Sequence, residues 1–149
     1  MPNINIGGIF FNSENVITQS KRPVNSNLDQ PIFEYKVETD FGTFIYTENT
    51  SQKSESTQDV YLSENEKPTI YKDMFNDVVI KNCQLTSIKG TEKEDSYMIE
   101  NGHVQNIDIS GDPQNEDSVG FLNDDNCDLT NITKDDNDIV ENWGSMRDK

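Results

Sequence analysis

The pattern of apolar and polar positions predicts strands along most of this 149-residue chain. The clearest alternation lies in residues 33–39, where one face is apolar and the other is charged. The apolar face consists of Phe33, Tyr35, Val37 and Thr39. Asp40-Phe41-Gly42 predicts a turn, and residues 43–47 predict a returning strand. We therefore expect residues 33–47 to form a β-hairpin.

Other segments give weaker patterns. Residues 4–17, which contain Gly7 and Gly8 followed by polar residues 12–15, predict one or two short strands with a turn between them. Residues 19–31, which contain two prolines, predict a loop. Tyr71, Met74 and Phe75 have the spacing of a single helical turn. Near the C-terminus, Ile139, Trp143 and Met146 recur at helical spacing, with Asp138 and Glu141 placed to cap. This predicts a short helix over residues 136–147.

A short pattern occurs three times between Val78 and Ile132. Each copy has an Asn, an apolar residue three positions later, and an Ile three positions after that. The copies are Asn82-Leu85-Ile88, Asn101-Val104-Ile107 and Asn126-Leu129-Ile132. The third copy departs upstream, because Leu122 precedes its Asn by four positions, whereas Ile80 and Ile99 precede theirs by two. Spacings of 19 and 25 residues between the asparagines indicate a repeat architecture.

This pattern resembles the coils of right-handed parallel β-helix proteins, the pectate-lyase-like group, over about residues 78–132. The resemblance implies stacked coils with asparagine side chains aligned at the turns. The alternative is an antiparallel meander or sandwich, in which the same residues form ordinary half-buried strands. Both alternatives belong to one all-β class. We expect a single domain of residues 1–149, made of N-terminal strands (1–62), the repeat region (78–132) and the C-terminal helix.

Composition strengthens the all-β prediction and adds a functional constraint. Only 32% of residues are hydrophobic, and the many Asn, Asp, Ser and Thr residues favour turns over helix interiors. The net charge is −16, and residues 91–149, with 16 acidic and 4 basic side chains, contribute −12 of it. Such a field repels nucleic acid and anionic membranes, and it attracts basic proteins. Without a leader sequence or a membrane-spanning segment, we expect a cytoplasmic protein.

The acidic residues are densest near the C-terminus. Six carboxylates lie within 15 residues that contain one basic side chain, Lys134. They are Asp124, Asp125, Asp128, Asp135, Asp136 and Asp138. We predict that they form the contact surface for a basic protein partner, such as a nuclease or another nucleic-acid-binding enzyme. The competing interpretation is a solvated acidic loop followed by a capped helix start.

Catalytic and metal-binding signatures are not evident in the sequence. His103 is the single histidine and has no accompanying nucleophile motif, and residues 124–128 fail the EF-hand pattern, leaving at most a weak surface calcium site. Cys83 and Cys127 hold equivalent repeat positions, so two stacked coils would separate them by about 9.6 Å. That distance is too long for a disulfide. We therefore expect both thiols to be free. Because no catalytic or metal-binding signature is present, we also expect no cofactor and no enzymatic activity.

Three functions remain open on this basis. The leading hypothesis is a non-enzymatic acidic binding or inhibitor protein, comparable in charge and size to immunity proteins or to phage anti-defence proteins. The first alternative is a carbohydrate-related β-helical module or a fragment of a phage spike. The second alternative is a structural repeat unit that assembles end to end. An amino-acid composition rich in Asn, Ile and Lys is typical of an AT-rich bacterial or phage genome.

Overall fold

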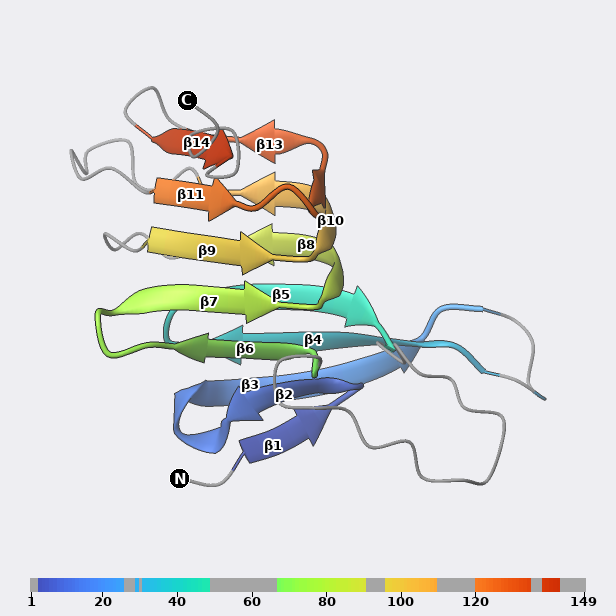
Figure 1. The fold of residues 1–149 in the computed structure, drawn as a ribbon. Coiled ribbons are helices and arrows are strands. Elements are labelled where there is room, and N and C mark those ends of the chain that lie inside the picture. The colour runs from blue at the N-terminus through green and yellow to red at the C-terminus, as the bar shows by residue number, and fades with distance from the viewer. Residues whose placement is uncertain are drawn as a thin grey trace.

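The computed structural model describes residues 3–25, 29, 31–48, 67–90, 96–109, 120–134 and 138–142. In those ranges the chain forms fourteen strands and one 3-10 turn, η1 (Ser13–Asn15), and contains no α-helix. The strands make two sheets that face each other (Figure 1). The prediction of an all-β protein is therefore confirmed.

Each sheet has seven strands. Sheet A contains, in spatial order, β1 (Asn3–Ile6), β2 (Ile9–Asn12), β6 (Thr69–Lys72), β7 (Asp77–Lys81), β9 (Ser96–Glu100), β11 (Gly120–Asn123) and β14 (Ile139–Asn142). Sheet B contains, in spatial order, β3 (Val16–Pro23), β4 (Phe33–Thr39), β5 (Gly42–Thr47), β8 (Gln84–Lys89) and β10 (His103–Asp108). Two short strands, β12 (Asp128–Leu129) and β13 (Ile132–Thr133), pair with the outer edge of β10.

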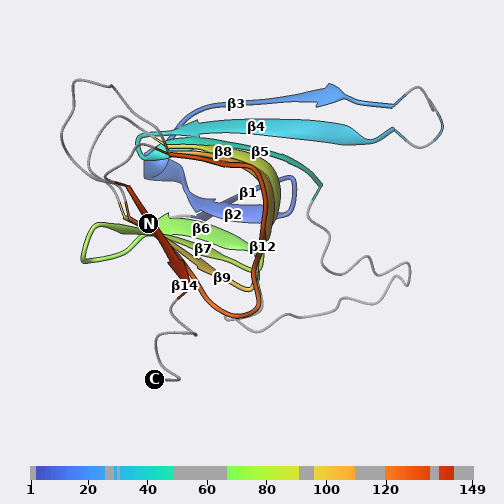
Figure 2. The same ribbon diagram turned by 90° about the horizontal axis from the view of Figure 1, so that it is seen from above.

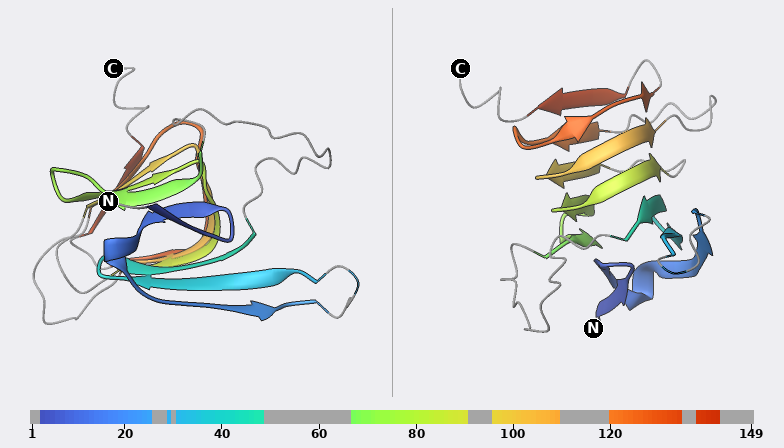
Figure 3. Two further views of the ribbon diagram at one scale, coloured as in Figure 1. Left: turned by 90° about the horizontal axis from the view of Figure 1, so that it is seen from below. Right: turned by 90° about the vertical axis from the view of Figure 1, so that its right-hand side faces the viewer.

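The repeat region alternates between the sheets, and within each sheet its own strands are parallel to one another. In sheet B, Val104 pairs with Leu85 on one side and with Leu129 on the other. Ile107 likewise lies between Ile88 and Ile132. The structure thus confirms the alignment of the three copies. The corresponding strands of sheet A are also parallel, and the strands lie in successive tiers (Figure 3).

The third copy differs from the other two in its first strand. Asn123 pairs with Ile99, which in turn pairs with Ile80, so Asn123 occupies the inward position at the end of β11. It is 8% exposed. Leu122 instead pairs with Met98 and lies outside the core cluster. The third bend therefore has one more residue than the others, which explains the irregular spacing in the sequence.

The N-terminal strands pair mainly in antiparallel, and β2 alone among β1 to β5 has a parallel neighbour, β6. The predicted hairpin is confirmed as β4 and β5, in which Val37 pairs with Phe44 and both are buried. β5 then pairs with β8 and connects this part of sheet B to the repeats. Two tyrosine hydroxyls hold the layers together, because Tyr46 donates to the Ile6 carbonyl (2.6 Å) and Tyr97 donates to the Phe41 carbonyl (2.7 Å).

The predicted loop over residues 19–31 is wrong for its first part, because β3 continues to Pro23. β3 is the last strand of sheet B, and with β4 it forms a ribbon that extends beyond the stack (Figure 2). Almost every residue of β3 is exposed. Pairing with the backbone of β4 stabilises this strand, so it needs no alternation of apolar residues.

The predicted C-terminal helix is also wrong where the chain is described. Residues 139–142 form β14, which pairs in parallel with β11 and sets Val140 beside Phe121. The edge of β11 offers backbone donors and acceptors, and their pairing outweighs a weak helical period. Trp143 and Met146 lie outside the described residues. The helical turn expected at Tyr71 is absent as well, since Tyr71 belongs to β6, and Met74 and Phe75 form a turn before β7.

Candidate functional site

The bend from sheet A to sheet B carries the first two repeat asparagines. Asn82 and Asn101 both have positive φ angles, 58° and 53°. Asn101 Nδ2 donates to Asn82 Oδ1 (2.8 Å), and Asn82 Nδ2 donates to the Lys67 carbonyl (3.2 Å). Asparagine tolerates the left-handed conformation, and its amide both donates and accepts hydrogen bonds. A single residue type therefore satisfies the backbone and the side-chain requirements of this bend.

Asp124 continues this arrangement at the third bend. Its Oδ1 accepts hydrogen bonds from the backbone N–H of Asn101 (3.1 Å), the backbone N–H of Asn126 (3.0 Å) and the thiol of Cys127 (3.1 Å). Asn126, which the sequence aligns with Asn82, is exposed and has no positive φ. The Asp124 carboxylate thus stabilises the bend through three donors, which limits what it can offer to a partner.

Asp125 and Asp128 lie at the same bend and face solvent. The side chain of Asp128 is 71% exposed, and its Oδ2 lies 3.2 Å from Nδ1 of His103, on the neighbouring strand. These two aspartates are accessible to a partner. His103 therefore has a local carboxylate neighbour at the surface.

Asp138, another of the acidic candidates, lies at the opposite edge of the stack. β13 pairs with the far end of β10, and the chain then returns from sheet B to sheet A before β14. Asp138 lies just before β14 and is 5% exposed, and its carbonyl accepts a hydrogen bond from Lys134 Nζ (3.2 Å). Asp135 and Asp136 lie outside the described residues. Of the described candidates, Asp124, Asp125 and Asp128 therefore lie at the bend, and Asp138 lies at the opposite edge.

Both cysteines are unpaired. Cys83 is buried, and burial raises the pKa of its thiol far above the ordinary value. Burial also raises the pKa of the Cys127 thiol to about 11, and the hydrogen bond to Asp124 acts in the same direction. A neutral thiol is a poor nucleophile. The geometry therefore gives neither cysteine the character of a catalytic residue.

The described residues also offer no arrangement that suits a metal ion. Among them, no group of three or more His, Cys, Asp or Glu side chains is placed to hold one. At the segment considered for calcium, the inner oxygen of Asp124 is already occupied by N–H and S–H donors. Calcium requires six to eight oxygen ligands, which this bend does not assemble.

A shallow groove of about 700 Å³ crosses the outer face of sheet B. It runs over β4, β5, β8, β10 and β13, and its lining is about equally polar and apolar. The polar residues are Lys36, Glu38, Thr39, Thr43, Ser87, Lys89, Asn106, Asp108, Asn131 and Thr133. Two lysines and two carboxylates balance one another here, in contrast to the acidity of the whole chain.

The sequence analysis did not identify this groove. Two of its residues, Asn106 and Asn131, nevertheless belong to the repeat pattern. Asn131 Nδ2 donates to Asn106 Oδ1 (3.2 Å), and Asn106 Nδ2 donates to the Thr86 carbonyl (3.2 Å). These residues form a second asparagine row, one strand length from the first. Asn106 and Asn131 occupy equivalent positions of the second and third copies. Their alignment could have been found once the copies were superposed, but the contribution of β4 and β5 could not.

Comparison with protein-family models, with curated proteins and with solved structures gives no match. Among the described residues, no helix is long and apolar enough to cross a membrane.

Proposed function

We propose that this protein is a non-enzymatic binding protein whose acidic edge covers a basic surface on another protein, such as a nuclease or a nucleic-acid-binding enzyme. The observation that carries this proposal is the parallel register of the repeats. Because the strands of each sheet start and end in register, the chain returns from sheet B to sheet A at the same edge each time. We call this the return edge, and its described ends are Gly90, Ser96, Ile109, Gly120, Lys134 and Asp138.

Three connections begin and end at the return edge, over residues 91–95, 110–119 and 135–137. Their sequences contain eight acidic residues and one lysine. The acidic residues are Glu92, Glu94, Asp95, Asp112, Glu116, Asp117, Asp135 and Asp136. The described residues that flank these three acidic segments therefore all lie at one edge of the stack. A negative field accelerates association with a basic surface and is weakened by salt.

The test compares two variants that remove equal charge from different edges. The first carries Asp112→Asn, Glu116→Gln and Asp117→Asn at the return edge. The second carries Asp125→Asn and Asp128→Asn at the bend, with Glu48→Gln. Binding to a panel of purified basic nucleases and nucleic-acid-binding proteins is measured at about 50 and 200 mM salt. We expect the first variant to associate more slowly and with less salt dependence than the second.

If both variants associate equally slowly, the effect comes from total charge and the return edge is not the binding surface. Stronger loss in the bend variant would transfer the function to Asp125 and Asp128. Complete absence of binding by the wild-type protein to basic partners at low salt would contradict the proposal as a whole.

We also infer that residues 77–142 form a short β-solenoid. The supporting observation is that equivalent residues of the three copies pair in parallel, in register, in both sheets. The asparagine row at the bend supports the resemblance to right-handed parallel β-helix proteins. In a repeat architecture each unit contacts its neighbours alone, and stacking buries the shared core.

The groove on sheet B favours a second candidate function, the binding of a polyhydroxylated ligand such as an oligosaccharide. Hydroxyl, amide and charged side chains alternate across five neighbouring strands there. Such groups both donate and accept hydrogen bonds, as sugar hydroxyls require. No aromatic side chain of the described residues lines this groove, and the hairpin aromatics Phe44 and Tyr46 are buried between the sheets.

A glycan array followed by calorimetry tests this second function. Asn106→Ala should weaken binding of any retained glycan, because it removes a groove side chain, whereas Gln84→Ala on the neighbouring strand should leave binding unchanged. Failure of every glycan to bind would remove this candidate.

A further inference from the structure

The turn between β6 and β7 is held in one conformation by hydrogen bonds. Asp73 Oδ1 accepts from the backbone N–H of Phe75 and from that of Asp77, each at 2.9 Å. The N–H of Asn76 donates to the Asp73 carbonyl (3.1 Å), and Asn76 has a φ of 66°. A three-residue hairpin loop that ends in a left-handed residue is a standard, well-defined geometry. The two residues at its tip, Met74 and Phe75, are therefore presented on a rigid support.

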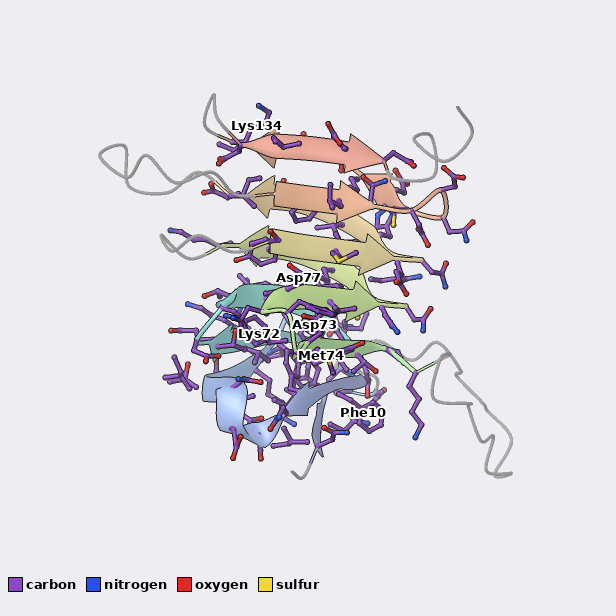
Figure 4. All side chains as sticks on the ribbon, turned by 60° about the vertical axis from the view of Figure 1, so that its left-hand side comes forward. Phe10, Lys72, Asp73, Met74, Asp77 and Lys134 are labelled. Carbon is purple, nitrogen blue, oxygen red and sulfur yellow. The ribbon has the colours of Figure 1, made fainter. Side chains whose placement is uncertain are left out.

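Both tip residues project into solvent. Met74 is 87% exposed and Phe75 is 77% exposed, the highest values among the large hydrophobic residues that the structure describes. Turn positions are usually filled by Gly, Pro, Asn, Asp or Ser, and nothing in this turn's hydrogen bonding requires an apolar side chain. An exposed aromatic residue on a pre-organised support is typical of an interaction anchor. Figure 4 shows Met74 beside Lys72, Asp73 and Asp77 on the sheet A side of the molecule.

The N-terminal end of the stack contains a hollow of about 460 Å³ between β1, β3 and β4. Tyr35 gives it an aromatic wall, Ile6 lies beneath it at 3% exposure, and the rest of its lining is mainly polar, with Lys21 as the cationic side chain. Gly7, with a φ of 59°, allows the backbone to pass close to Tyr35, because a Cβ there would lie 2.5 Å from the tyrosine ring. Only glycine fits this approach. The hollow is thus a feature of the fold itself.

The charges around the tip and the hollow are complementary. Asp73 and Asp77 flank the apolar tip, and Lys21 lines the hollow. Burial and the neighbouring Asp73 raise the pKa of Asp77, so an approaching cation would stabilise its charged form. Lys21 lies over the Phe33 ring, and the next residue, Arg22, pairs with Glu34 on β4 (2.9 Å).

We propose that the Met74–Phe75 tip of one copy of this protein inserts into the Ile6–Tyr35 hollow of a second copy, with Lys21 of the second copy facing Asp77 of the first. The tip and the hollow belong to different parts of the surface, so the contact is head-to-tail and each copy retains one free tip and one free hollow. The contact is far smaller than a standard stable interface. Association is therefore weak and depends on concentration, and it needs enough salt to screen the net charge of −16.

The experiment uses two complementary variants of the full chain. Met74→Ser with Phe75→Ser removes the tip and keeps the hollow. Lys21→Glu reverses the charge at the hollow and keeps the tip. Sedimentation velocity is measured from about 10 μM to about 1 mM protein at about 150 mM salt. Wild type should show a sedimentation coefficient that rises with concentration, and each variant alone should remain monomeric.

An equimolar mixture of the two variants should form a dimer and stop there, because only one tip and one hollow are intact in each pair. Asp77→Lys combined with Lys21→Glu should restore self-association by exchanging the two charges. Ile139→Ser, which removes a residue that is 49% exposed elsewhere on sheet A, is the matched control and should associate like wild type. Thermal melting of every variant checks that the fold is retained.

Three results would overturn the proposal. The first is a wild-type protein that stays monomeric over the whole concentration range. The second is undiminished association after removal of Met74 and Phe75. The third is a mixture of the two variants that contains no dimer.

Discussion

Asn101 donates a side-chain hydrogen bond to Asn82 across 2.8 Å and so joins the left-handed bend residues of two successive repeats. The side chain of Asn82 in turn donates a hydrogen bond to the Lys67 carbonyl, which lies before the first repeat. The row therefore connects the repeats to the N-terminal part of the chain. Its stability rests on two properties of each residue, the backbone conformation and the side-chain amide.

Asn101 variants should separate these two contributions. Asn101→Gly keeps access to the left-handed conformation and removes only the side-chain hydrogen bond, so we expect a loss of about 1 kcal/mol. Asn101→Ala loses both, with a further cost of roughly 1–2 kcal/mol for the left-handed backbone. Chemical denaturation measures both free energies of unfolding, and Gln105→Ala, an exposed change in β10, is the control. Equal losses for the glycine and alanine variants would show that the backbone conformation contributes nothing.

Gly102 should resist replacement by the residue that the repeat pattern suggests. Cysteine occupies the equivalent positions in the other copies, Cys83 and Cys127, yet a Cβ at Gly102 would lie 2.9 Å from Ile99 Cγ2 and 3.3 Å from the Cys83 carbonyl oxygen. Gly102→Ala and Gly102→Cys should each cost about 1–3 kcal/mol through overpacking. Thermal melting measures this, with Gly120→Ala, where the nearest atom would be 3.6 Å away, as the control. A melting temperature unchanged by Gly102→Ala would contradict the close packing.

Asp124 should contribute to stability, whereas its neighbour Asp125 should not. Asp124→Ala leaves the N–H groups of Asn101 and Asn126 and the Cys127 thiol without their common acceptor, at a cost of about 1–3 kcal/mol. Asp125→Ala changes an exposed side chain and should stay within about 0.5 kcal/mol of wild type. Urea denaturation compares the two variants directly. Equal effects would mean that the third bend does not depend on the Asp124 carboxylate.

Cys127 should make the protein sensitive to alkaline pH. The native state holds the thiol proton more tightly than the unfolded chain, because the pKa is raised from 9.0 to about 11. This stabilising contribution is complete below pH 9.0 and is lost as the pH rises toward about 11. Cys127→Ser keeps a hydrogen-bond donor to Asp124 without titrating in this range. Melting temperatures between these pH values should therefore fall less steeply in the variant, and parallel curves would contradict the assignment.

Val140 should be the residue through which the last strand is anchored. In β14 it pairs with Phe121 and packs against the core, whereas Ile139 is half exposed. Val140→Ser should cost about 1–2 kcal/mol, and Ile139→Ser should have little effect. A C-terminal helix would reverse the order, because Ile139, Trp143 and Met146 would then form the buried face. Chemical denaturation of the two variants distinguishes the strand from the helix.

The sequence by itself determined the elements whose own residues carry a complete pattern. Alternation in residues 33–39 specified the hairpin, since one face of each strand is buried against the core. The recurrence of Asn, an apolar residue and Ile specified which positions of the repeats stack, because parallel coils bring equivalent residues side by side. The unpaired cysteines follow from the same alignment.

The tertiary structure decided what depends on a neighbouring strand. β3 and β14 form because β4 and β11 offer backbone hydrogen bonds at open edges. The residues of β3 and β14 themselves have no pattern that predicts these strands. The substitution of Asn123 for an inward Ile became visible only through its pairing with Ile99. The same is true of Asp128 and Asp138, which are ten residues apart in sequence but are separated by the path of the chain along β12 and β13 from one edge to the other. Sequence distance measures the length of chain between two charges, whereas the register of the strands determines which edge each charge reaches.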